Sequence, residues 1–222
     1  KSVADAVLAL AAPATVDFSE VVYESTTFPN SFKSNANLAG IVFPQNVTAT
    51  ASAAFQKTGM TSVTVLKDIS YGSNAFDSCA SLVSVTVEEG VTEIGNYMFQ
   101  NTKLTDVTLP NSVTKIGASA FNGCSLTTIN FGQGVKTIEN SAFQNCGELT
   151  EIILPDATET LGQNAFGDCP KLAKISLGKN MKTLEAYCFV GYSKGCPLLG
   201  DIICRATTPP TLKDDYGTGP FG

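Results

Sequence analysis

The chain has 222 residues, 43% of them hydrophobic and 15% charged, and its net charge is −6 at pH 7. Its 14 Lys and Arg residues are dispersed, which excludes a nucleic-acid-binding role and disfavours anionic membranes, because phosphate binding requires clustered positive charge. The absence of histidine excludes Ser-His-Asp and Cys-His nucleophilic sites and histidine-based zinc sites. The sequence also lacks a glycine-rich phosphate loop, so we expect no cofactor and no enzyme activity.

Residues 1–14 predict a short helix that caps the N-terminal end of the fold. Ser2 can act as its N-cap, and Pro13 ends it. One face of this helix is apolar and consists of Val3, Val7 and Leu10. A signal-peptide remnant is the alternative, but a short apolar run without a clean cleavage site fits that interpretation poorly.

Residues 15–37 predict a degenerate first coil of the pattern that follows. Phe18 and Phe32 are 14 residues apart, the same spacing as Ile129 and Phe143 in a later copy. We therefore place Phe18 at a strand position. The terminal units of a repeat array are expected to be atypical.

From residue 38 onward the chain repeats one pattern, and we number its units as coils. Coils 2 to 8 are the seven repeats of residues 38–198, and residues 199–222 form coil 9, a C-terminal repeat with a cap. The copies follow one another without a linker, so we predict a single domain over residues 1–222. The opening residues, spaced by 22, 22, 22, 22, 23, 23 and 27 positions, are Leu38, Met60, Leu82, Leu104, Leu126, Leu149, Leu172 and Leu199.

Each coil predicts two extended segments and a turn. Apolar residues at offsets 3 and 5 from the opening residue alternate with polar ones, as in SVTV at 84–87, which is typical of a strand buried on one face. A second extended segment ends at offset 12, and an Ala-Phe pair then follows in a 3₁₀ or single helical turn. Thr50 and Gly72 replace the apolar residue at offset 12 in coils 2 and 3, so we expect these two coils to be less regular.

One column of side chains is predicted to form an aromatic spine through the stacked coils. Burial of each ring contributes roughly 1.5–3 kcal/mol, so the spine is a large part of the core. It contains Phe32, Phe55, Phe76, Phe99, Phe121, Phe143, Phe166 and Phe189.

A second column lies three residues after each spine phenylalanine. Its members are small and can form hydrogen bonds in a buried turn: Asn35, Thr58, Cys79, Thr102, Cys124, Cys146 and Cys169. None of the seven cysteines forms a CxxC motif, and each has a structural place, Cys188 before a spine ring and Cys204 at a core position of a strand. We expect them to be buried and mostly reduced, because side chains in one column are spaced by the coil repeat, too widely for a disulfide.

The C-terminal part departs from the repeat in two places. Phe189 is followed by the insertion VGYSKG, which contains Tyr192 and Lys194. Insertions in solenoids form surface loops, and a tolerated loop is a simpler interpretation than a binding edge. The last stretch is rich in proline and glycine, so it predicts a blunted end, because proline cannot donate to a sheet.

The pattern LxxIxLPxxVxxIGxxAFxxC over residues 38–212 resembles the BspA-like, Treponema pallidum-type leucine-rich repeat of bacterial surface proteins. CRATTPPTL at 204–212 is similar to the closing repeat of such proteins. This resemblance implies a leucine-rich-repeat solenoid of α/β type, right-handed and curved, with mostly short parallel strands and 3₁₀ or helical turns. It also implies a non-enzymatic adhesion module at the cell surface or secreted, as the mature part of an exported protein with a lipid anchor as one option.

The outward strand positions, at offsets 2 and 4, form the candidate partner-binding surface, which we call the polar strip. Serine and threonine are ordinary outward residues of strands and need no ligand, so a plain solvated face remains the alternative. We expect a monomer that binds a host or matrix protein or a glycan, without nucleic acid and without direct membrane insertion; a structural spacer with no ligand is the second hypothesis. The polar strip consists of Ser62, Thr64, Ser84, Thr86, Asp106, Thr108, Thr128 and Asn130.

Overall fold

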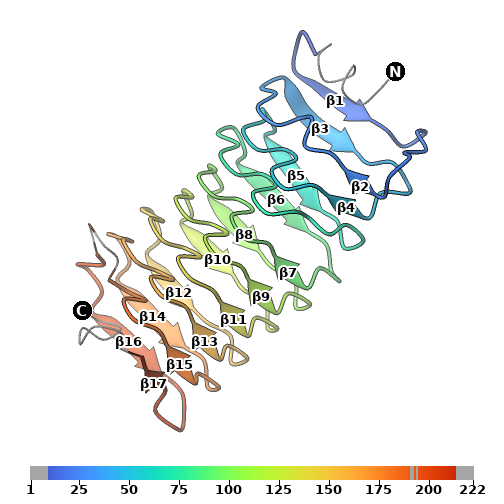
Figure 1. The fold of residues 1–222 in the computed structure, drawn as a ribbon. Helices are drawn as coiled ribbons and strands as arrows, with labels where there is room; N and C mark the ends of the chain where they lie inside the picture. The colour runs from blue at the N-terminus through green and yellow to red at the C-terminus, as the bar shows by residue number, and fades with distance from the viewer. Residues whose placement is uncertain (1–9, 191–192, 194, 214–222) are drawn as a thin grey trace.

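The computed structural model describes residues 10–190, 193 and 195–213, which form seventeen β-strands and no helix. The strands wind into one elongated stack, with β1 and β17 at opposite ends (Figure 1). Every strand pair within the described residues is parallel. The predicted parallel solenoid is therefore confirmed.

The coils contribute to two rows of strands. The first row contains the strands of offsets 2 to 5: β1 (Ala14–Asp17), β3 (Leu38–Val42), β5 (Ser62–Val65), β6 (Ser84–Val87), β8 (Asp106–Thr108), β10 (Thr128–Asn130), β12 (Glu151–Ile153), β14 (Lys174–Leu177) and β16 (Asp201–Cys204). The second row has two-residue strands near offset 12: β2 (Thr27–Phe28), β4 (Ala49–Thr50), β7 (Glu93–Ile94), β9 (Lys115–Ile116), β11 (Thr137–Ile138), β13 (Thr160–Leu161), β15 (Thr183–Leu184) and β17 (Thr211–Leu212).

The two rows differ in continuity. In the second row, six strands from β7 to β17 form one sheet. The first row is not one sheet, because hydrogen bonds divide its described strands into the groups β1–β3, β5–β6, β8–β10 and β12–β14–β16. The irregularity expected for coil 3 is confirmed, since only a bridge between Ala49 and Ser70 stands where a second-row strand is expected.

The turn around each spine phenylalanine is not helical, which corrects the expected 3₁₀ or helical turn. In the regular coils the residues two before and two after the ring have positive φ, for example Ser119 at 53° and Gly123 at 72° on either side of Phe121. Left-handed residues break a helix, and they direct alternate backbone groups along the stack instead. The Phe121 N–H accordingly donates to Ala142 O of the next coil at 2.8 Å.

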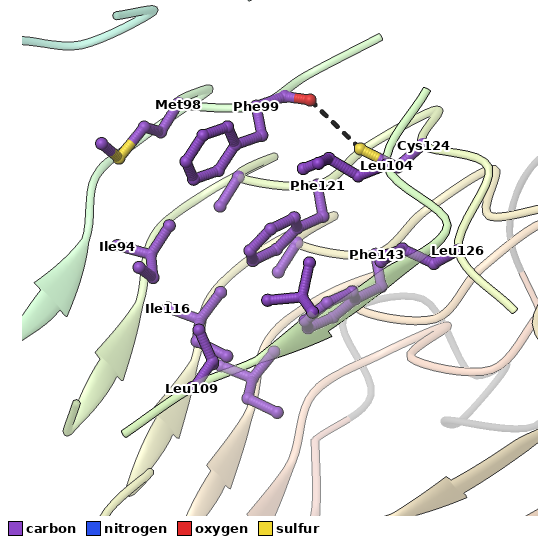
Figure 2. Close-up of a cluster of buried hydrophobic side chains, with 14 of the residues drawn as sticks. Ile94, Met98, Phe99, Leu104, Leu109, Ile116, Phe121, Cys124, Leu126 and Phe143 are labelled. Carbon is purple, nitrogen blue, oxygen red and sulfur yellow. Dashed lines mark hydrogen bonds between the residues drawn. The ribbon is translucent and has the colours of Figure 1, made fainter. Parts of the chain in front are cut away.

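The aromatic spine is confirmed from end to end. All eight spine rings are buried, and consecutive ring centroids lie 5.2–6.5 Å apart with interplanar angles of 5–27°. Figure 2 shows Phe99, Phe121 and Phe143 stacked beside Ile94 and Ile116 of the second row. The offset stacking of rings adds to the hydrophobic term, so the spine couples each coil to both of its neighbours.

Replacement of a central spine ring tests this assignment. We expect Phe121→Ala to lower the free energy of unfolding by about 3–5 kcal/mol, because it leaves a cavity between two stacked rings. Val83→Ala, at a side chain that is 49% exposed, should cost less than about 1 kcal/mol. Urea denaturation of both variants gives the two values, and equal losses would contradict the assignment.

The column of small residues serves one buried carbonyl per coil. The Cys124 Sγ donates to Phe99 O of the preceding coil at 3.1 Å (Figure 2). The Thr102 hydroxyl donates to the same oxygen at 2.9 Å. The corresponding contact, from the thiol to the backbone carbonyl of the spine phenylalanine in the preceding coil, is made by Cys79, Cys146, Cys169 and Cys196. A buried carbonyl without a partner is costly, so this column stabilises the turns.

The thiols differ in exposure more than we expected. Five are buried, but Cys196 is only half-buried, and Cys204 is exposed because it lies in β16, the last strand of the first row. Burial raises the pKa of Cys124 to about 11 and that of Cys188 to about 12. Such thiols are poor nucleophiles near neutral pH, since the thiolate is the reactive form.

A thiol titration follows from these environments. In the native protein without reductant, a disulfide reagent should react promptly with Cys204 and more slowly with Cys196. The five buried thiols should react only after unfolding, which brings the total to seven. A total near one in the unfolded, unreduced protein would show that disulfides have formed and would contradict the prediction.

The predicted N-terminal helix is not supported within the described residues. Residues 1–9 lie outside the described part of the chain, residues 10–13 have no regular structure, and Ala14 already belongs to β1. Pairing of β1 with β3 supplies backbone hydrogen bonds that a terminal helix would not offer to the edge of the sheet. Leu10 still packs against the core.

The register expected for coil 1 is also wrong, by two residues. The Phe18 N–H donates to Val42 O at 3.0 Å, as the Leu109 N–H donates to Asn130 O in a regular coil. Phe18 therefore occupies offset 5, and Val16, paired with Ile41, occupies offset 3. Coil 1 therefore has two more residues between offset 5 and its spine ring than a regular coil, and these lie in the turn that follows Phe18. In this turn the side-chain amide of Asn46 donates to Tyr23 O and accepts from the Tyr23 N–H.

Coils 6, 7 and 8 are joined by a set of ion pairs that periodicity alone did not reveal. Four acidic residues each face a lysine 23 positions later, at 2.6–3.0 Å: Glu148–Lys171, Glu151–Lys174, Asp156–Lys179 and Glu159–Lys182. Exposed pairs of this kind contribute only about 0–1 kcal/mol each. Because the pairs match in one register, Glu148–Lys171 opposes a shift of coil 7 along coil 6, and the other three oppose a shift of coil 8 along coil 7.

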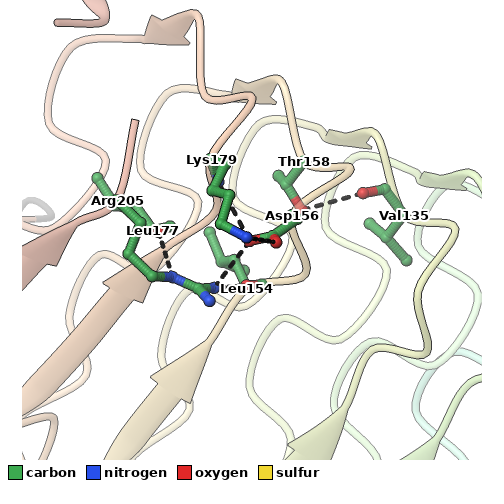
Figure 3. Close-up of polar contacts among 7 residues, drawn as sticks. All are labelled: Val135, Leu154, Asp156, Thr158, Leu177, Lys179 and Arg205. Atoms are coloured by element: carbon green, nitrogen blue, oxygen red, sulfur yellow. Dashed lines mark hydrogen bonds and ion pairs between the residues drawn. The ribbon is translucent and has the colours of Figure 1, made fainter. Parts of the chain in front are cut away.

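Arg205, the chain's only arginine, ties the last coil to two earlier ones (Figure 3). Its Nε donates to Leu177 O at 3.2 Å, its Nη2 donates to Leu154 O at 3.0 Å, and Nη2 lies 3.3 Å from Asp156 Oδ1. The same corner contains the Thr158 hydroxyl, which donates to Val135 O. These contacts satisfy carbonyls where the first row ends.

The insertion in coil 8 is held by a buried carboxylate. Asp168 Oδ1 accepts the N–H groups of Ser193 and Gly195, both at 2.9 Å. Asp168 itself is only 3% exposed, and its Oδ2 accepts from the side chain of Gln144. Tyr192 and Lys194, which we singled out in this insertion, lie outside the described residues.

Candidate functional site

All eight residues of the polar strip are exposed on the outward side of the first row. Their order across the strands follows from the parallel register: Ser62 lies beside Ser84, Thr64 beside Thr86, Asp106 beside Thr128, and Thr108 beside Asn130. The strip therefore forms two parallel columns, one at offset 2 and one at offset 4. It is divided in the middle, because β6 and β8 do not share a hydrogen-bonded ladder.

The strip residues are not equally available to a ligand. Asp106 Oδ2 accepts a hydrogen bond from the Thr105 hydroxyl at 3.0 Å, and Asn130 Oδ1 accepts the Gly132 N–H at 3.2 Å. The second contact holds the turn that follows β10, so Asn130 has a structural role. The Asp106 carboxylate and the Asn130 amide are therefore already engaged within the protein.

The strip changes character after β10. On β12 and β14 the offset-2 residues are Glu151 and Lys174, which form an ion pair at 2.7 Å. This contact with Glu151 raises the pKa of the Lys174 ammonium. At offset 4, Ile153 is 59% exposed. A ligand of the polar strip is therefore expected to contact β5 to β10.

Coil 3 lacks a second-row strand, and Gly72 occupies the core position of that missing strand. In coils 4 to 8 the residue at offset 12 fills the core from the second row, as Ile94 and Ile116 do. A Cβ added at Gly72 would lie 2.6 Å from Ala51 C, so no side chain fits there. The ring of Tyr71 packs inward instead, with its centroid 5.7 Å from that of Phe76.

The Tyr71 hydroxyl then takes over hydrogen bonds that normally join neighbouring coils. It accepts the Leu66 N–H at 3.3 Å and lies 3.5 Å from Thr64 O, to which it donates. Elsewhere the equivalent N–H can bond to the preceding coil, as Glu88 N–H does to Val65 O, and the equivalent carbonyl can accept from it, as Asn130 O does from Leu109 N–H. Strand β3 therefore has no backbone hydrogen bond to β5 among the described residues.

A groove opens where these two strands separate, and we call it the β3–β5 groove. Its volume is about 760 Å³, within the range of small-ligand pockets. The half-buried side chains of Ile41, Phe43 and Val63 form its floor. Its outer wall is polar and contains four residues of the polar strip: Ser62, Thr64, Ser84 and Thr86.

One end of the β3–β5 groove is charged. It is formed by Lys67, Asp68 and Glu88 at the turns that follow β5 and β6. Glu88 Oε2 accepts the Lys67 N–H at 3.1 Å, which fixes the two turns relative to each other. The sequence analysis did not identify the floor or this end, although the replacement at Gly72 marked the coil as irregular.

Removal of the Tyr71 hydroxyl should show that it replaces the missing contact between coils. We expect Tyr71→Phe to lower the free energy of unfolding by about 1–2 kcal/mol, because Leu66 N–H and Thr64 O lose their partner. Tyr97→Phe, at a ring that is 39% exposed, should change it by less than about 0.5 kcal/mol. Equal values for the two variants would contradict this role.

Tyr71 also makes the free energy of unfolding depend on pH in alkaline solution. Burial, with a smaller contribution from the charge of Glu88, raises the pKa of Tyr71 to about 12. The pKa of tyrosine in the unfolded chain is about 10. The contribution of neutral Tyr71 to the free energy of unfolding is therefore fully present below pH 10 and is lost as the pH rises through 12, by up to about 2–3 kcal/mol. Denaturation between pH 9 and 12 should show a smaller loss for Tyr71→Phe than for the wild type.

Within the described residues, no group of three or more Cys, Asp or Glu side chains is placed to hold a metal ion. The described part of the chain also contains no helix with the length and apolarity needed to cross a membrane.

Comparison with known proteins identifies the repeat family. The family described as BspA type leucine rich repeat region matches residues 15–80 and 70–195, in six copies. No curated protein matches the sequence. Two solved structures share the fold: a leucine rich cell surface protein from Faecalibacterium prausnitzii A2-165, with 22% identity and a TM-score of 0.59, and a leucine-rich repeat protein from Eubacterium ventriosum ATCC 27560, with 21% identity and a TM-score of 0.55.

Both alignments cover 87% of this chain, which spans only 60% and 62% of the two solved chains. Identities this low establish the fold and nothing more specific. The family match covers most of the described residues, in the repeats that carry the spine and the strand rows. The protein belongs to the BspA-type leucine-rich-repeat family.

Proposed function

We propose that the protein is a non-enzymatic binding module of the bacterial cell surface, or a secreted one, that recognises a host or matrix protein or a glycan through the polar strip. The observation that carries this proposal is the two-column array of exposed hydroxyls on β5 and β6, beside the β3–β5 groove. A parallel solenoid presents these groups on a stiff support, so little ordering entropy is lost when a partner binds.

The chemistry of the strip fits a polar partner. Hydroxyl groups such as Thr86 and Thr108 both donate and accept hydrogen bonds, so they can pair with sugar hydroxyls or with peptide groups. Each contact is weak, and multivalent display on a surface would raise the overall affinity. The family match and the Faecalibacterium structure, described as a cell surface protein, support the proposed location.

The test begins with arrays of matrix proteins and glycans, probed with the purified chain. We expect Thr86→Arg combined with Thr108→Arg to abolish binding of any ligand found, because the two long side chains cover the offset-4 column. The melting temperature should stay nearly unchanged, since both positions are exposed.

The control pair is Thr92→Arg with Gln133→Arg, two exposed positions outside the first row of strands. It adds the same charge and should leave binding intact. If the control pair abolishes binding and the strip pair does not, the site lies elsewhere and the polar strip is only a solvated face.

A structural spacer is the second candidate function. It is favoured by the absence of aromatic side chains on the polar strip, because Tyr, Trp and Arg usually supply most of the binding energy at interfaces. In this case the arrays would give no ligand at any concentration, and a shortened stack that lacks coils would retain every property except its length.

A further inference from the structure

We propose that the β3–β5 groove binds an extended peptide segment of a protein partner, with one apolar side chain inserted between the two strands and a basic residue at the charged end. This inference deepens the proposed function and rests on it. The observations that carry it are the apolar floor, the unpaired strand edges and the charge of the rim.

The floor of the groove matches an apolar side chain. Ile41, Phe43 and Val63 face into it without being fully buried, and the buried Met60 lies behind them. At the position equivalent to Val63, Val107, Ile152 and Ile175 are buried, whereas Val85 and Ile129 are half-buried like Val63. An inserted apolar side chain would remove the exposed part of this floor from water, which is favourable in proportion to the area covered.

The strand edges supply main-chain partners. No backbone hydrogen bond joins residues 39–43 to residues 62–66, all of which lie in the described chain. The Tyr71 hydroxyl already serves Leu66 N–H and Thr64 O on the β5 side. The groups of Phe43 that would have met them are therefore free for another chain, as in the addition of a peptide to an exposed sheet edge.

The rim sets the direction and charge of the peptide. Hydroxyl positions alternate along β5 and β6 with the two-residue period of a strand, so an extended peptide can follow them. At the charged end, Asp68 and Glu88 outnumber Lys67 by two carboxylates to one ammonium. A basic side chain on the peptide complements this excess negative charge.

A glycan suits the groove less well than a peptide. Its hydroxyl groups would pair with the rim, but the floor offers them only hydrocarbon. Burial of a hydroxyl without a hydrogen bond costs free energy, so a sugar ring gains little by entering. The peptide satisfies both parts of the site, because its main chain is polar and its side chain is not.

The experiment uses the full chain and defined peptides, followed by ¹⁵N–¹H correlation spectra. The probe is acetyl-Thr-Leu-Thr-Lys-Thr-amide, and the controls are the same peptide with Ala in place of Leu and the neutral sugar maltotriose. We expect the leucine peptide to cause saturable shifts at Ile41, Val63 and Lys67. The alanine peptide should bind at least about tenfold more weakly, since it has fewer apolar groups to bury.

A blocking variant gives the second arm. Ser62→Trp places a large ring at the rim of the groove, and Asp201→Trp is its control at the same offset on β16, outside both the polar strip and the groove. The first should abolish the shifts and the second should leave them unchanged, with similar melting temperatures. Because the shifts are mapped on the wild type, the inference stays testable even if Ser62→Trp does not fold.

The outcomes separate this inference from the proposed function. Shifts at β8 and β10 alone, no saturable shifts, or stronger shifts with maltotriose than with the peptide would overturn the peptide groove. If an array ligand loses binding with the Arg pair on the polar strip but not with Ser62→Trp, the binding function stands and the groove assignment falls. If neither change affects that ligand, both fall.

Discussion

The fold depends on the turn that carries the buried phenylalanine of each coil. At this point the ring stacks on its neighbours, and the amide of the same residue donates to the carbonyl before the next ring, as Phe121 N–H does to Ala142 O. A single position thus combines burial with a hydrogen bond between coils. The left-handed residues on either side, thirteen of which are not glycine across the described chain, are tolerated because both interactions hold the turn in place.

A stack of near-identical coils has a difficulty of its own, because many registers would bury the same apolar residues. The protein limits this ambiguity with local features that differ from coil to coil. Coil 7 presents carboxylates and coil 8 presents lysines at matching positions, so the pairs Glu151–Lys174 and Asp156–Lys179 form in one register only. Arg205 then fixes the last coil against Leu154 and Leu177. Exposed charges of this kind contribute little to stability, but mismatched charges would be unfavourable in a shifted stack.

The candidate site arises where the repeat fails. Gly72 leaves no side chain at offset 12, Tyr71 fills the space, and its hydroxyl replaces the contacts that would hold β3 against β5. Regular coils present flat, solvated strands, whereas this coil presents a groove with an apolar floor. Gly72 makes room for the Tyr71 ring, and the Tyr71 hydroxyl then occupies Leu66 N–H and Thr64 O on the side of β5 that faces β3.

The sequence by itself determined the solenoid, the number of coils and the aromatic spine, because period and apolar register are local properties of the chain. It also placed the eight residues of the polar strip on one face, since side chains alternate along a strand. Only the tertiary structure decided the split of the first row, the groove beside Val63, the exposed end at Cys204 and the pairing of Ala14–Asp17 with β3. Each of these features depends on contacts with a neighbouring coil, which provides a hydrogen-bond partner, leaves a space or covers a surface. The residues of a single repeat do not determine such contacts.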